Sequence, residues 1–294
     1  MSKYKSVFYA LAVMLLWGTL FPTVKLGYTA YRIVTVSDIL LFAGVRFTVC
    51  GALICLFSAV TKPETVKVKK TDIFPLLGVG LFAVILHYSF SYLGLLFTES
   101  SKTAIIKQIG PLLYVCFSFV FFKDDKFSAK KLVAAIMGFV GIIAINYGAG
   151  KVSFGAGEIF VLMASFCTVF SNVIGKRAFQ SVSPVAGTGI SQLFGGLVLL
   201  IAGICAGGKM TFSFAHSGTF IYICIASVIS YCLWYTVVKS GELSKLFIIK
   251  FAEPVFACIF GAALLGEEIF KVQYLIAFLL IGGGIYISNK TKHT

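Results

Sequence analysis

Long apolar stretches, separated by short polar connections, run along the whole chain. Ten of them are close to the length of about 20 residues that a helix needs to cross about 30 Å of hydrocarbon. They cover residues 6–27, 38–60, 72–97, 102–122, 129–147, 157–178, 184–206, 215–238, 245–265 and 270–288. The stretches are too long and too uniformly apolar for the strands of a membrane barrel, so each predicts a transmembrane helix.

Composition and charge support a membrane protein and give it an orientation. Only 12% of the 294 residues are charged, whereas soluble domains carry about 25%. With the amino terminus in the cytoplasm, sixteen of the 25 lysines and arginines fall on the cytoplasmic side and six on the opposite side. The positive-inside rule therefore predicts a multi-pass protein of the inner (cytoplasmic) membrane with both termini cytoplasmic. Contact with membrane lipid accounts for the basic loops, so no nucleic-acid partner is expected.

The two halves of the chain are related copies. IIKQIGP, which begins at Ile105, aligns with IIKFAEP, which begins at Ile248, at an offset of 143 residues. We therefore predict a first repeat over 6–147, a linker over 148–156 and a second repeat over 157–288. Each repeat holds five helices, an odd number, so the second repeat enters the membrane from the opposite face. The predicted fold is an all-α polytopic membrane protein with ten transmembrane helices in two inverted five-helix repeats, a symmetry common among secondary transporters.

Three segments resemble a known family. PLLYVCFSFVFFKDDKFSAKKLVAAIMGFVGI from Pro111 and PVFACIFGAALLGEEIFKVQYLIAFLLIGGGIYI from Pro254 resemble the second part of the EamA-type repeat of the drug/metabolite transporter superfamily. LLWGTLFPTVKLG, which contains Trp17, resembles the opening of the family's first helix. The resemblance covers about 8–147 and 157–288. It implies a ten-helix bundle whose substrate path is lined by helices 1, 3, 4, 6, 8 and 9.

Lys107 and Lys250 are the matched cations inside the predicted helices, each four residues before a proline. A charge deep in a bilayer costs about 2.5–3.5 kcal/mol on insertion scales, so we expect both ammonium groups to face the interior and contact substrate. The alternative is snorkelling toward the headgroups, because each lysine lies only about two turns inside its helix. IIKFAEP also resembles the lysine-containing segment of phosphate translocators, where such lysines bind anionic substrates.

Three prolines and two further charges have candidate roles in the same helices. Pro111 and Pro254 each free the backbone carbonyl of the preceding lysine, and Pro22 frees one in the first helix, so these prolines are candidate hinges or packing bends. Glu253, three residues after Lys250, predicts either an ion pair with that lysine or a proton-coupling carboxylate. Arg46 is a candidate ion-pair partner or an anchor of the second helix.

Aromatic and polar side chains complete the candidate substrate lining. They combine an apolar body with a hydrogen-bonding tip, which suits the recognition of polar or aromatic solutes. Ordinary helix packing is the alternative for each. The candidates are Trp17, His87, Tyr88, Tyr92, Asn172, Tyr231, Trp234 and Tyr235.

Secondary active transport by alternating access is the function that these features favour. The expected cargo is a small polar metabolite, such as an amino acid or another zwitterionic or anionic solute. A phosphorylated-metabolite or organic-anion exchanger and an organic-cation or drug exporter are alternatives. An integral membrane enzyme is the alternative of another class, but we expect no catalytic residues, metal site or cofactor. The expected partners are a small-molecule substrate and membrane lipid, and the protein is expected to be a monomer or homodimer.

Overall fold

Each of the ten predicted apolar stretches contains helix among the residues that the structure describes. The computed structural model describes residues 3–65, 67–97, 106–122, 128–145, 155–211, 214–265 and 272–289. Within these ranges all regular structure is helical, which confirms the predicted all-α fold.

The helices follow in order along the two halves. The first half contains α1 (Lys3–Tyr31), α2 (Val36–Thr61), α3 (Lys70–Gly80), the π-helical turn η2 (Leu81–Leu86), α4 (His87–Phe97), α6 (Ile109–Phe121) and α7 (Ala129–Ile145). The second contains α8 (Ala156–Ser181), α9 (Pro184–Cys205), α10 (Ser217–Ser240), α11 (Leu243–Lys250), α12 (Ala252–Leu265) and α13 (Val272–Asn289). Short 3₁₀ turns, η1 (Pro63–Thr65) and η3 (Phe214–His216), precede α3 and α10.

Seven segments among the described residues are long and apolar enough to cross a membrane. They are Tyr4–Tyr31, Val36–Thr61, Lys70–Ser91, Ala156–Ser181, Pro184–Cys205, Phe214–Ser240 and Leu243–Leu264. Their backbone groups are satisfied within each helix, as hydrocarbon requires. The chain is therefore a polytopic membrane protein.

The second helices of the two halves, α2 and α9, pack against each other and run in opposite directions. A Cβ added to Gly44 would lie 2.3 Å from the backbone nitrogen of Leu200, and one added to Gly51 would lie 2.3 Å from that of Leu193. The facing residue number falls along α9 as it rises along α2, so the two helices are antiparallel. Glycine at the crossing lets the two backbones approach closely. Equivalent helices that run in opposite directions are what inverted repeats require.

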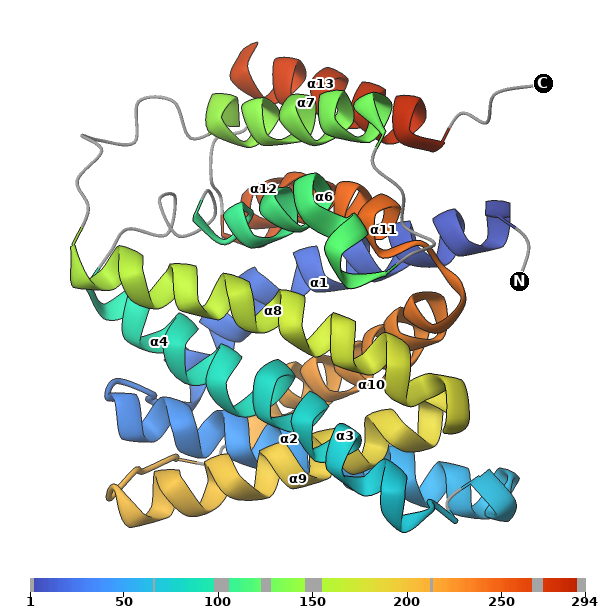
Figure 1. Cartoon of the computed structure of the whole chain (residues 1–294). Helices are drawn as coiled ribbons and strands as arrows, with labels where there is room; N and C mark the ends of the chain where they lie inside the picture. The colour runs from blue at the N-terminus through green and yellow to red at the C-terminus, as the bar shows by residue number, and fades with distance from the viewer. Residues whose placement is uncertain are drawn as a thin grey trace.

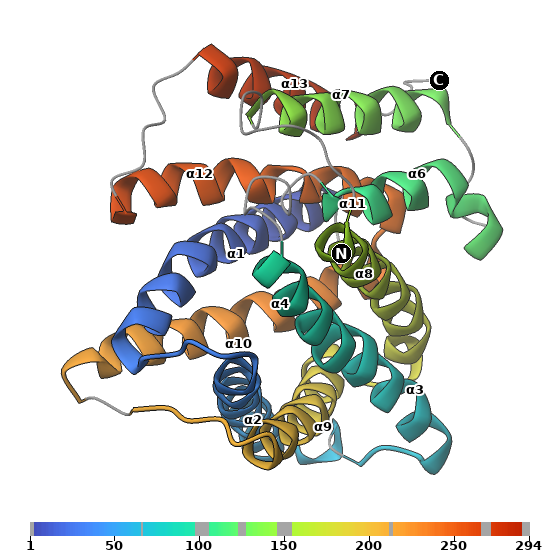
Figure 2. The ribbon, with the colours of Figure 1, turned by 90° about the vertical axis from the view of Figure 1, so that its left-hand side faces the viewer.

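The remaining contacts follow the same two-fold pattern. α1 packs against α10 and α12, and its counterpart α8 packs against α4 and α6. The pair α2/α9 lies at one end of the view in Figure 1, and the pair α7/α13 lies at the other. Figure 2 shows α1, α4, α8 and α10 between these pairs. The middle of the bundle is thus built from both halves.

Two predicted helices are interrupted at their lysine and proline motifs. The sequence predicts one helix over 245–265, but α11 ends at Lys250 and α12 begins at Ala252, with Pro254 in its first turn. In the first half, Lys107 lies in a turn just before α6, and Pro111 falls in the first turn of that helix. Proline is favoured in a first turn because its missing N–H has no intrahelical partner there. By contrast, α1 continues through Pro22.

Candidate functional site

Lys250 and Glu253 form a buried ion pair across the break between α11 and α12. Their side chains are 9% and 7% exposed, and Lys250 Nζ lies 2.5 Å from Glu253 Oε2. The same ammonium nitrogen lies 4.5 Å from the centroid of the Trp17 ring on α1. A buried cation is tolerated when a carboxylate and an aromatic face replace its water. The second-half lysine is therefore held from two sides.

Trp17 also connects α1 to α10. Its Nε1–H donates to Ser230 Oγ at 2.9 Å. The Trp17 ring lies 5.6 Å from the Tyr231 ring and 5.2 Å from the Trp234 ring, measured between centroids. Trp17 thus links the Lys250 ammonium to the aromatic residues of α10.

Tyr88 on α4 and Tyr231 on α10 meet across the two-fold axis. Their hydroxyl oxygens lie 3.0 Å apart and share a hydrogen bond. The two tyrosines are equivalent residues, related by the 143-residue offset. Equivalent residues touch only where they lie at the symmetry axis, so this pair marks the centre of the bundle.

His87 and Asn172 belong to a polar chain between α4, α8 and α10. His87 Nδ1 lies 3.0 Å from the carbonyl oxygen of Ala164, which only accepts, so Nδ1 carries the hydrogen. Asn172 Nδ2 donates to the Thr168 carbonyl at 2.7 Å, and its Oδ1 accepts from Trp234 Nε1–H at 2.6 Å. The π-helical turn η2 ends immediately before His87, and such turns are frequent at functional sites.

The Lys107 backbone is tied to α8 through Ser165. Ser165 Oγ donates to the Lys107 carbonyl at 2.6 Å and accepts the Gly110 N–H at 2.9 Å. Pro111 has no N–H to bond that carbonyl, so the serine hydroxyl takes its place. A distant helix therefore stabilises the first-half break.

Lys107, Lys250, Glu253 and His87 belong to one electrostatic cluster. Lys107 lies close enough to Glu253 and Lys250 for their charges to act on its ammonium group. His87 lies within the electrostatic range of both lysines. The fold therefore brings together the lysines that the two halves hold 143 residues apart in sequence.

Arg46 and Tyr235 each contact a neighbouring helix. Arg46 is 3% exposed and donates from Nε and Nη2 to Ser227 Oγ at 3.1 and 2.8 Å. This contact fastens α2 to α10. Tyr235 packs its ring 4.8 Å from the Phe179 ring on α8. The predicted candidate Tyr92 belongs to α4, but its side chain lies outside the described residues.

The small hydroxyl residues around the cluster were not among the predicted site residues. Ser165 and Thr168 precede Asn172 at helical spacing on α8. Ser227 and Ser230 precede Trp234 in the same way on α10. Polar residues three or four positions apart share one helix face, so this spacing is the signal that identifies both stripes.

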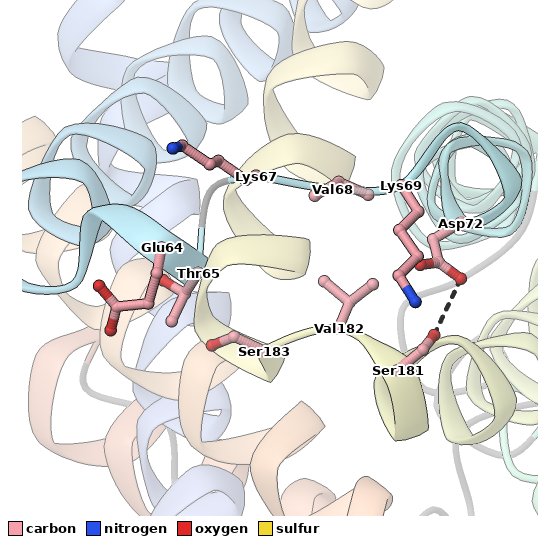
Figure 3. A pocket seen from close by; sticks show the side chains of 9 residues that line it. All are labelled: Glu64, Thr65, Lys67, Val68, Lys69, Asp72, Ser181, Val182 and Ser183. Atoms are coloured by element: carbon pink, nitrogen blue, oxygen red, sulfur yellow. Dashed lines mark hydrogen bonds between the residues drawn. The ribbon is translucent and has the colours of Figure 1, made fainter.

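A separate cavity of about 210 Å³ lies at the end of the bundle where the connections after α2 and α8 meet (Figure 3). Its lining consists of Glu64, Thr65, Lys67, Val68, Lys69, Asp72, Ser181, Val182 and Ser183. Across it, Ser181 Oγ donates to Asp72 Oδ1 at 2.9 Å. The two acidic residues and the two lysines of the lining balance in charge. None of the predicted site residues lines this cavity. The central cluster is therefore the better candidate site.

Inverted helical repeats with helices broken beside a central charged cluster define a class of membrane transporters. The EamA-like transporter family model matches residues 4–147 and 155–289. The chain belongs to the EamA-like transporter family, which confirms the resemblance drawn from its sequence.

Known proteins similar to this chain are also transporters by name. The "Uncharacterized inner membrane transporter YedA" of Escherichia coli (strain K12) is 25% identical over 92% of this chain and 86% of its own length. The "Uncharacterized transporter YvbV" of Bacillus subtilis (strain 168) is 25% identical over 94% of this chain and 89% of its own length. One solved crystal structure shares the fold, with a TM-score of 0.79 at 18% identity over 98% of this chain and 97% of that one.

Proposed function

We propose that this protein is a secondary active transporter that carries a small zwitterionic or anionic metabolite by alternating access. The observation that carries the proposal is the central cluster, where Lys107 and Lys250 both lie near the carboxylate of Glu253. These three groups sum to one positive charge in a low-dielectric interior, where an electrostatic attraction is strong. A solute that bears a carboxylate or phosphate fits such a site.

The inverted architecture supports transport by alternating access. In the inverted bundle, Lys107 belongs to the outer half and Lys250 to the cytoplasmic half, with the Tyr88–Tyr231 contact at the axis between them. A rocking motion of one half against the other exposes this centre to each side in turn. The breaks before α6 and after α11 lie beside the two lysines and support a role as backbone hinges. This role makes the protein a carrier and not an enzyme.

We place the protein in the cytoplasmic membrane with both termini in the cytoplasm. α1 begins and α13 ends on the same side of the bundle (Figure 1). The surplus of basic connections belongs to that side, in accord with the positive-inside rule. An inner membrane location is also part of the name of the Escherichia coli relative YedA.

Thermal stabilisation of the purified protein tests the charge class of the substrate. The panel consists of amino acids, organic and phosphorylated anions, and organic cations, each measured against buffer of equal ionic strength. We expect stabilisation by solutes with a carboxylate or phosphate, followed by uptake of those solutes into proteoliposomes. Stabilisation by cations alone would contradict the proposal.

A further inference from the structure

Gln192 on α9 is a buried carboxamide whose hydrogen-bonding groups are unused. It is 2% exposed, and neither Oε1 nor Nε2 has a hydrogen-bond partner among the described residues. Buried amides are nearly always bonded, because an unused donor or acceptor loses its water without compensation. The neighbouring Ser191 follows that rule, since its Oγ donates to the Leu76 carbonyl at 2.8 Å.

The helical position of Gln192 directs it between two neighbours of α9. Gly195, three residues on, abuts Val84 in the π-helical turn η2. Gly196, four residues on, abuts the backbone of Thr48 on α2. Side chains at i, i+3 and i+4 share one helix face. Gln192 therefore faces the space between η2 and α2, on the inner side of the bundle.

The two-fold symmetry locates this space more closely. For α2 and α9 the two halves are offset by 145 residues, two more than in the later helices. With this offset Gly51 corresponds to Gly196 and Leu193 to Thr48, and the structure has both contacts, Gly51 with Leu193 and Gly196 with Thr48. The same offset makes Gln192 the counterpart of Phe47.

In the first half, the Phe47 ring lies 4.7 Å from the Tyr88 ring and 6.1 Å from the Tyr231 ring, between centroids. Because the tyrosine pair lies on the axis, the two-fold relation brings the backbone position of Gln192 to face the same pair. The second half therefore presents a carboxamide where the first half presents a phenyl ring.

We propose that Gln192 contacts the substrate and selects zwitterionic amino acids over simple anions. The inference rests on the proposed transport function. A carboxamide accepts at Oε1 and donates at Nε2, so it pairs with an ammonium group and a carboxylate carried on one carbon. A substrate with acceptors only leaves Oε1 unbonded, and an amine without a carboxylate leaves Nε2 unbonded. A site built to bond a polar group rejects analogues that lack it.

Paired substitutions on neighbouring residues test the proposal. Gln192→Leu removes unused polar groups at nearly constant volume, so without substrate the protein is expected to keep or raise its melting temperature. Ser191→Ala, the control, removes a structural hydrogen bond and is expected to lower the melting temperature without altering selectivity. The probes are the L-amino acids, each compared with the acid that lacks its amine and the amine that lacks its carboxylate.

The expected result is at least a tenfold loss of amino-acid affinity in Gln192→Leu, with affinity for the matching acid changed less than threefold. A melting temperature lowered as in Ser191→Ala, with selectivity unchanged, would make Gln192 a structural residue and overturn the inference. Wild-type binding of acids and phosphates but not of amino acids would overturn it while leaving the proposed function standing. Wild-type binding of none of the panel would reject both.

Discussion

The two lysine and proline motifs hold equivalent positions in the two halves, yet their surroundings are built differently. At Lys250, Glu253 supplies a carboxylate at 2.5 Å, and Trp17 supplies a ring face at 4.5 Å. At Lys107, the residue equivalent to Glu253 is Gly110. The second-half lysine is therefore held by electrostatic contacts with α12, across the helix break, and with α1.

The first-half break depends on close packing instead. A Cβ added to Gly110 would lie 2.6 Å from Ser165 Oγ and 2.8 Å from the Ser165 carbonyl oxygen. Glycine thus lets α8 approach α6 closely enough for Ser165 to bond the Lys107 carbonyl. Both halves have a helix break beside the lysine. The breaks differ in the residue three positions after the lysine, which is Gly110 in the first half and Glu253 in the second. The halves of an inverted repeat need not contribute equally to one site.

Removing the carboxylate from the second-half site is expected to have the largest effect. Glu253→Gln leaves Lys250 buried without its ion-pair partner, which costs about 3–5 kcal/mol when one member of such a pair is lost. Thermal unfolding in detergent measures the loss. The double variant Lys250→Met/Glu253→Leu removes both charges and is expected to recover most of the stability. A single variant as stable as the wild type would mean that the pair contributes nothing.

The same variant distinguishes pairing from proton coupling. If Glu253 carries the coupling proton, Glu253→Gln abolishes accumulation driven by a pH gradient while substrate exchange persists. Both activities are measured in proteoliposomes, well below the melting temperature of the variant. Equal loss of both would favour a structural ion pair with Lys250.

Replacing the two lysines in turn compares their contacts with substrate. Gly110, three residues after Lys107, supplies no carboxylate, whereas Glu253 pairs with Lys250. We therefore expect Lys107 to contribute more to substrate binding. Lys107→Gln is expected to weaken binding of an anionic or zwitterionic substrate at least tenfold. This loss corresponds to one hydrogen bond to a charged group, which contributes about 1.5–3 kcal/mol. Lys250→Gln is expected to have a smaller effect. Binding to correctly folded, purified protein is the measurement, and wild-type affinity in both variants would indicate snorkelling.

Adding one methyl group tests the close packing of the first-half site. Gly110→Ala places a Cβ against Ser165 and is expected to cost about 1–3 kcal/mol of stability through overpacking. Gly218→Ala is the matched control, because a Cβ at Gly218 meets nothing within 4 Å. Thermal unfolding of the two variants side by side gives the comparison. Equal melting temperatures would show that α6 and α8 separate without penalty.

Trimming Trp17 is expected to have the smallest effect. Trp17→Phe keeps an aromatic face near Lys250 but removes the hydrogen bond from Nε1 to Ser230 Oγ. A neutral hydrogen bond contributes about 0.5–1.5 kcal/mol, so a small drop in melting temperature is expected. Trp17→Leu, which also removes the aromatic face, is expected to cost more. An equal loss in the two variants would exclude a role for the aromatic face.

The helices and their duplication could be predicted from the sequence because they depend on local properties. Hydrocarbon forces each apolar stretch to satisfy its own backbone groups, so length and composition locate the helices. The spacing of Lys250 and Glu253 brings them within reach on adjoining helical turns. An odd number of helices in each half fixes the inversion. The π-helical turn η2 has no comparable pattern in its apolar sequence and was not predicted.

The contacts that make a site from these elements were decided by the tertiary structure. Tyr88 and Tyr231 meet because α4 and α10 cross at the symmetry axis. Ser165 bonds the Lys107 carbonyl because Gly110, which has no side chain, lets α8 pack closely against α6. The inner position of Gln192 depends on how α9 packs against α2 and η2. Sequence spacing sets which residues share a helix face, whereas the crossing geometry that joins two faces comes from many small packing contacts between distant segments.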